Sequence, residues 1–166
     1  YSLDLALLMA ALSSTLQFSI GEDTVFTGQV ATVEGHFLPV GGIPEKLSAA
    51  AADPSVTRFI FAAVDTDESA KQLSPEETDR VRKAVIEHKD QLDIKAVRDL
   101  FELFPLVANE EEVCLASLRS DYFSGISANP TTDSPVDKTI GHLVQGNDVR
   151  FWTAVEGHLL KSNFKR

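Results

Sequence analysis

The sequence has little cysteine, few basic residues and no long apolar run. The only cysteine, Cys114, excludes a disulfide within the chain and is expected to be a small buried apolar side chain. Single-cysteine usage favours a reducing compartment, so a cytoplasmic location is expected. Lys and Arg number 15 against 25 Asp and Glu, and a net charge of −10 disfavours direct binding to nucleic acid or anionic membranes. The run LDLALLMAAL is too short to span a bilayer, which needs about 20 apolar residues.

The composition that remains is that of an ordinary globular protein. Of the 166 residues, 43% are hydrophobic and 24% are charged, which is enough for one domain with a real core or one domain with an appendage. The sequence begins at Tyr1 without an initiator Met or a signal-peptide pattern and enters an apolar helix almost at once. We therefore expect a segment of a longer polypeptide.

Apolar periodicity and capping residues predict alternating helices and strands up to about Ala108. Residues 3–16 have apolar side chains nearly all round and are expected to form a central, mostly buried helix. Ser74, Pro75 and two glutamates are typical of a helix start, and Pro105 is expected to end or disrupt the last helix. This order predicts a mixed α/β fold with a sheet and packed helices. Strands are expected within 24–35, 36–40, 56–64 and 92–97, and the other helices within 44–52, 73–89 and 98–104.

The C-terminal part has a different pattern of residues. A turn-rich linker at 124–135 precedes two segments with helical spacing of apolar residues, 134–146 and 147–163. In the second of these, Phe151 and Trp152 are expected to belong to the core of a helical pair. We therefore expect two parts, residues 1–114 and a linker with a helical extension at 115–166.

Lys46 stands near the start of an alanine-rich helix, where the unpaired backbone amides disfavour a cation. Gly41 and Gly42 form the preceding turn, and Pro44 suits the first helical position. An ordinary lysine has a pKa of about 10.4. A helix N-terminus and apolar surroundings would lower that pKa, so that Lys46 could act as a general base for a hydroxyl nucleophile. Periodicity alone does not choose the serine.

The segment FTGQVATVEGHFLPVGGIPEKLSAA resembles the signature of the Lon peptidase family. That signature has a Thr-Gly at the end of a strand and then Leu-Pro-x-Gly-Gly-x-x-x-Lys-Leu, which includes the catalytic lysine. The upstream run SLDLALLMAALSS is similar to the nucleophile helix of the family, and Ser2 falls where the family has its catalytic serine. The matching positions are Thr27, Gly28, Leu38, Pro39, Gly41, Gly42, Lys46 and Leu47.

The resemblance implies a serine endopeptidase with a Ser-Lys dyad. Ser2 would attack the peptide carbonyl, Lys46 would accept and return the proton, and Thr27 would orient Lys46. It implies the Lon proteolytic-domain fold, which is similar to domain 2 of ribosomal protein S5, with the N-terminal part of the domain outside this sequence. Substrate-binding residues are not assigned, and the dyad needs no metal.

The resemblance also implies partners. Members of the family are usually ring-shaped homo-oligomers, for which a hexamer is one option, and are usually coupled to an ATPase module earlier in the same chain. ATP and Mg²⁺ would belong to that module, and this part of the chain would need no cofactor. The substrates would be unfolded polypeptides.

The residues around Ser2 depart from the family pattern and support an alternative. The family has Gly-Pro-Ser-Ala-Gly, whereas this chain has Tyr1, Ser2, Leu3 and Asp4. The Asp4 carboxylate would oppose negative charge developing beside Ser2. Related domains that have lost the serine carry Asp-Leu here, so the alternative is a weak or inactive Lon-like domain that serves the assembly of an ATPase machine.

Other chemistries have less support. No His-Glu-x-x-His pair is present, and the spacing of the histidines indicates neither a zinc site nor a histidine-based triad. VGGIPEK lacks the spacing of a phosphate-binding P-loop, which disfavours a nucleotide-dependent transferase. The four histidines are His36, His88, His142 and His158.

Overall fold

The computed structural model describes residues 2–16, 18–32, 35–67, 69–119, 145–146 and 149–163. Contacts along the chain divide it into two compact units, Tyr1–Leu103 and Phe104–Arg166. The domain division expected after residue 114 stays a prediction.

The first unit contains a parallel three-stranded sheet. Its strands are β1 (Thr24–Thr27), β4 (Arg58–Ala62) and β5 (Asp93–Val97), in the order β1-β4-β5. Thr27, at the end of β1, is in register with Phe61 of β4. Two short strands, β2 (Gln29–Val30) and β3 (Phe37–Leu38), form an antiparallel pair after β1. The strands predicted within 24–35 and 36–40 are therefore confirmed, and the first is divided at Gly28 into β1 and β2.

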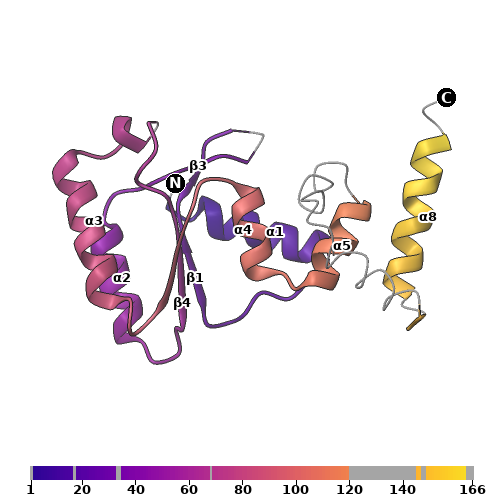
Figure 1. Cartoon of the computed structure of the whole chain (residues 1–166), viewed down its shortest axis with the longest axis horizontal. Helices are drawn as coiled ribbons and strands as arrows, with labels where there is room; N and C mark the ends of the chain where they lie inside the picture. The colour runs from indigo at the N-terminus through magenta and orange to yellow at the C-terminus, as the bar shows by residue number, and fades with distance from the viewer. Residues whose placement is uncertain are drawn as a thin grey trace, which may run out of the picture. The chain divides into compact units, whose positions relative to one another are not determined.

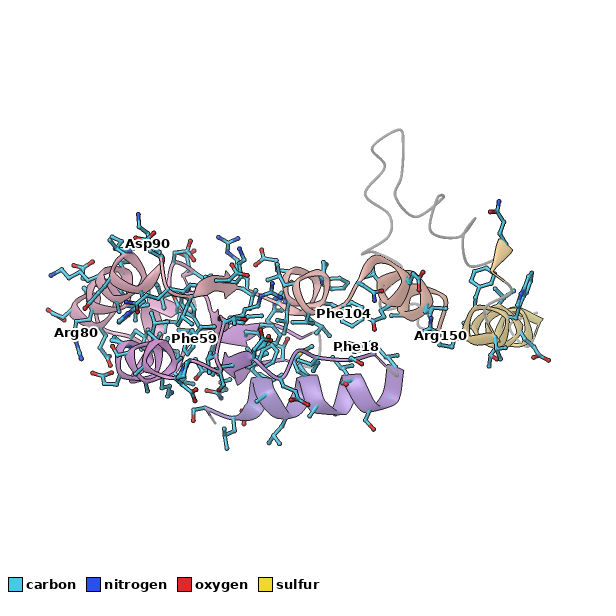
Figure 2. All side chains as sticks on the ribbon, turned by 90° about the horizontal axis from the view of Figure 1, so that it is seen from below. Phe18, Phe59, Arg80, Asp90, Phe104 and Arg150 are labelled. Atoms are coloured by element: carbon cyan, nitrogen blue, oxygen red, sulfur yellow. The ribbon has the colours of Figure 1, made fainter. Side chains whose placement is uncertain are left out.

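Helices cover both sides of this sheet. Figure 1 shows α2 (Ile43–Ala52) and α3 (Pro75–His88) on one side and α1 (Asp4–Leu16) on the other. Because side chains alternate in direction along a strand, Phe59 and Phe61 of β4 share one face of the sheet, and both are buried among residues of α2 and α3. Figure 2 shows Phe59 between α2 and the strands. The mixed α/β architecture expected from the sequence is confirmed.

The start of α3 follows from its sequence. The Ser74 hydroxyl accepts a hydrogen bond from the Glu77 backbone N–H at 3.2 Å, and Pro75 occupies the first helical position. A short 3₁₀ helix, η1 (Ser69–Lys71), precedes it. The predicted capping of this helix is confirmed.

The expectation that α1 is buried on most sides is wrong. Leu5 and Met9 are fully buried, whereas Leu3 and Leu7 are 66% and 65% exposed. Residues four positions apart share one helix face, so Leu5 and Met9 lie on the buried face and Leu3 and Leu7 on an exposed one. Apolar composition alone does not say which sides of a helix have neighbours.

Pro105 does not end or disrupt its helix, contrary to expectation. The helix α4 (Leu100–Val107) continues two residues beyond the proline. Leu103 and Phe104 of this helix are fully buried, whereas Pro105 is exposed. Burial of these two apolar side chains, at about 25 cal/mol per Å², offsets the hydrogen bond that a proline removes.

The second unit contains two described helices that contact each other, α5 (Glu110–Arg119) and α8 (Val149–Asn163). Leu115, Ala116, Phe151 and Ala154 are buried, and Trp152 is 45% exposed. The helix predicted over 147–163 is confirmed. The one predicted over 134–146 lies outside the described residues except for 145 and 146, and the Cys114 side chain lies outside them as well. Among the described helices, none is long and apolar enough to cross a bilayer.

Candidate active site

The turn before α2 positions Lys46. Gly42 caps the helix with φ 74°, a left-handed conformation that glycine adopts without steric cost. The Lys46 backbone N–H donates to the Gly42 carbonyl at 3.1 Å. Because the helix begins at Ile43, Pro44 is its second residue, one position later than the sequence suggests. Lys46 therefore lies one turn from the N-terminus of α2.

The Lys46 amine is held by two oxygen atoms from different elements. Its Nζ donates to Thr27 Oγ1 at 3.3 Å and to the Gly41 carbonyl at 3.1 Å. Thr27 lies at the carboxyl end of β1 and is 3% exposed. The contact between Lys46 and Thr27 that the resemblance implies is therefore present in the structure.

Partial burial changes the proton affinity of this amine. Removal of water around Lys46 lowers its pKa below the ordinary value for lysine, and the neighbouring Glu45 carboxylate partly opposes this by raising the pKa. A lower pKa increases the fraction of neutral amine, which is the form that accepts a proton. Burial is thus the main reason why the pKa of Lys46 is lowered.

The N-terminus of α1 is attached to the same strand end. The Leu5 backbone N–H donates to the Gly28 carbonyl at 3.2 Å, directly after Thr27 in the chain. Gly28 is needed for this approach, because a Cβ there would lie 3.1 Å from the Ala62 Cβ and 3.4 Å from the Leu5 Cδ2. This contact brings the α1 N-terminus, which Ser2 precedes, to the strand that carries Thr27.

Ser2 is half-buried in the turn before α1. Among the described residues, no hydrogen bond joins Ser2 to Lys46, whose amine contacts Thr27 and Gly41 instead. Asp4 is half-buried in the first turn of α1. The structure therefore brings Lys46 and Thr27 into contact, and the role of Ser2 is a proposal based on the motif.

Sequence reasoning missed two features of the site. The Gly41 carbonyl is a second anchor for the amine, whereas the sequence indicates only that Gly41 belongs to a turn. Arg80 of α3 forms an ion pair with Glu45, the neighbour of Lys46. Figure 2 shows Arg80 at the outer edge of the helical layer. No sequence signal relates Arg80 to Glu45, because the pair forms only when α3 packs beside α2.

A serine and a histidine meet elsewhere on this unit. Ser48 Oγ lies 3.2 Å from His88 Nε2, and His88 Nδ1 lies 3.2 Å from Gln91 Oε1. Ser48 is inside α2, where its hydroxyl donates to the Pro44 carbonyl at 3.0 Å. Backbone amides inside a helix are already bonded, so no donors remain beside Ser48 to stabilise an oxyanion. This contact is better explained as a link between α2 and α3. Within the described ranges, no group of three His, Cys, Asp or Glu residues could hold a metal ion.

Comparisons with known proteins agree with the motif around Lys46. No model of a protein family matches the sequence. The chain is similar to a Lon protease. It is 28% identical over 137 residues to Lon protease 1 of Hydrogenovibrio crunogenus. The matched residues make up 82% of this chain and 16% of that protein. The resemblance to Lon proteases is confirmed, and the chain spans about a sixth of the length of this Lon protease.

Proposed function

We propose that this chain contains the peptidase site of a Lon-like serine endopeptidase, with Ser2 as nucleophile and Lys46 as general base. The observation that carries the proposal is the partly buried Lys46 amine, held between Thr27 Oγ1 and the Gly41 carbonyl. The similarity to a Lon protease supports the same assignment. We also propose that the chain has the fold of the Lon proteolytic domain, which is similar to the second domain of ribosomal protein S5.

In the proposed reaction the neutral Lys46 amine takes the proton of the Ser2 hydroxyl as Ser2 Oγ attacks the peptide carbonyl carbon. The resulting tetrahedral intermediate collapses when the Lys46 ammonium gives a proton to the leaving amine, which breaks the C–N bond. Water then attacks the acyl-enzyme, with Lys46 again as the base. Thr27 accepts a hydrogen bond from Lys46 throughout and fixes the direction of its amine.

Backbone amides at the start of α1 would stabilise the oxyanion. The N-terminal turn of a helix has amides without partners inside the helix and a positive end of the helix dipole. Leu5 uses its N–H for Gly28. The amides of the preceding residues, Leu3 and Asp4, are therefore the proposed oxyanion donors.

The remaining parts of the activity are proposed to lie outside this chain. A module that hydrolyses ATP with Mg²⁺ would unfold substrates and feed them to Ser2, as an ATP-dependent protease requires. The chains would assemble into a homo-oligomeric ring that encloses the sites. Unfolded polypeptides are the proposed substrates.

Cleavage of casein by the assembled protein tests this proposal. Ser2→Ala and Lys46→Met are each expected to abolish cleavage, because either change removes one member of the dyad. Ser14→Ala alters an exposed serine of α1 and should leave the rate unchanged. Cleavage that survives both dyad variants would show that the dyad is wrongly assigned.

A second candidate function is a non-proteolytic assembly domain, and Asp4 is the observation that favours it. Its carboxylate lies in the first turn of α1, where the oxyanion would form. In this case the chain assembles with its ATPase partner but releases no peptides from casein, and Asp4→Gly does not change this. Cleavage that depends on Lys46 excludes the second candidate.

A further inference from the structure

The outer edge of β5 has backbone groups that no other strand in the described part of the chain uses. β5 pairs in parallel with β4 on one side. Asp93 donates its backbone N–H to the Thr57 carbonyl, and Ala63 donates to the Val97 carbonyl. Since backbone groups alternate in direction along a strand, Ile94 and Ala96 direct theirs away from β4. This edge can therefore accept a further strand.

The backbone just beyond β5 pairs with another segment of the chain. The Phe37 N–H donates to the Arg98 carbonyl at 2.8 Å, and His36 forms an antiparallel bridge with Asp99. The backbone at 98–99 is thus covered from inside the chain. The vacant stretch that remains is short and centred on Ile94 and Ala96.

An apolar groove lies beside this stretch on the α3 side of the sheet. Its volume is about 430 Å³, and Phe61, Val85, Ile86 and Ala96 contribute to its walls. Ile86 is 65% exposed. Ala96 is in register with Phe61, whose side chain packs towards α2 and α3, so Ala96 faces the same side. A strand added at Ile94 and Ala96 would place side chains directly over this groove.

The charged groups around the groove are already paired within the chain. Arg82 forms an ion pair with Asp79 at 3.1 Å, and Asp65 forms one with Arg98 at 3.3 Å. On the opposite side of the sheet, Lys95 pairs with Asp93 at 2.8 Å. An apolar partner can therefore cover the groove without burying an unpaired charge.

We propose that the β5 edge and this groove bind a second copy of the chain, with the two β5 strands antiparallel and Ile94 opposite Ile94 of the second copy. This register brings Asp93 of each copy opposite Lys95 of the other, which is a favourable cross-strand charge pair. A register in which Ile94 faces Ala96 would instead set Lys95 against Lys95 of the second copy. The charge pattern of β5 thus selects one register.

The two-fold axis of this pairing is perpendicular to the sheet. Both copies of α3 then lie on the same side of a continuous sheet, and Ile86 of each copy covers the groove of the other. Such an interface is isologous and closes as a dimer, whereas a ring needs a different, heterologous surface. The pairing does not depend on the proposed peptidase function.

Sedimentation equilibrium of the chain tests the proposal first with single variants. The parent is expected to dimerise, and Ile86→Glu should abolish the dimer because it places a charge in the apolar groove. Ala96→Pro should also abolish it, because this N–H points away from β4 and is needed only by the second copy. Leu7→Glu is the matched control, since Leu7 has the same 65% exposure on α1 and should leave the dimer intact.

Charge exchange on β5 tests the register. Lys95→Glu alone and Asp93→Lys alone each set like charges opposite one another, and each should weaken dimerisation by about tenfold. Mixing these two variants should restore a heterodimer, because Asp93 then faces Lys95, and Glu at 95 faces Lys at 93. A monomeric parent would overturn the proposal, as would assembly that Ile86→Glu and Ala96→Pro leave unchanged. Failure of the mixture to associate would overturn the register.

Discussion

At the scale of single residues, Thr27 is the side chain through which the fold directs the Lys46 amine. Thr27→Val removes Oγ1 and leaves the Gly41 carbonyl as the remaining anchor of Lys46 Nζ. A hydrogen bond of this kind contributes about 1 kcal/mol. We therefore expect kcat/KM for casein peptides to fall by about five- to tenfold. Thr24→Val, at the other end of β1, is the control and should leave kcat/KM unchanged.

Glu45 and Arg80 are expected to set the pH at which activity appears. The neutral Lys46 amine is the active form, so activity rises as pH increases through the pKa of Lys46. Glu45 raises that pKa, and Glu45→Gln should move the rise of kcat/KM to lower pH. Arg80→Gln leaves Glu45 without its ion-pair partner and should move the rise to higher pH. Shifts in the same direction for both variants would show that Lys46 is not the titrating base.

At the scale of elements, Gly28 fixes the distance between the α1 N-terminus and the sheet. Gly28→Ala places a Cβ 3.1 Å from the Ala62 Cβ, and overpacking of this kind typically costs about 1–3 kcal/mol. The free energy of unfolding in urea should fall by that amount. Gly157→Ala is the matched control, because no atom lies within 4 Å of its added Cβ and alanine favours the interior of α8 by roughly 0.5–1 kcal/mol. Equal stabilities of the parent and Gly28→Ala would contradict the close approach.

The sequence predicted those elements whose causes are local. Ser74 and Pro75 specify the start of α3, and the continuous apolar run around Phe59 specifies a buried strand. The exposure of Leu3 and the continuation of α4 through Pro105 depend on which neighbours pack against each helix, and no short stretch of sequence contains that information. Lys46 and Thr27 are 19 residues apart, so only the family resemblance related them before the structure.

At the scale of the whole molecule, assembly and chemistry are expected to be separable. β5 and β1 form the two opposite edges of the three-stranded sheet, and Thr27 lies on β1. Ile86→Glu should therefore lose the dimer and retain a reactive Ser2, whereas Ser2→Ala should do the reverse. Sedimentation equilibrium and peptidase assays on both variants check this. Loss of both properties in either variant would show that the two surfaces are coupled.

The assignment of Ser2 and Lys46 as a dyad is tested most directly by covalent labelling with a fluorophosphonate, which reacts with activated serine hydroxyls. Mass spectrometry of the digested protein locates the label. We predict that the parent chain is labelled at Ser2, that labelling accelerates with rising pH, and that Lys46→Met abolishes it. An unlabelled Ser2 in the parent, or labelling that persists in Lys46→Met, would contradict the dyad.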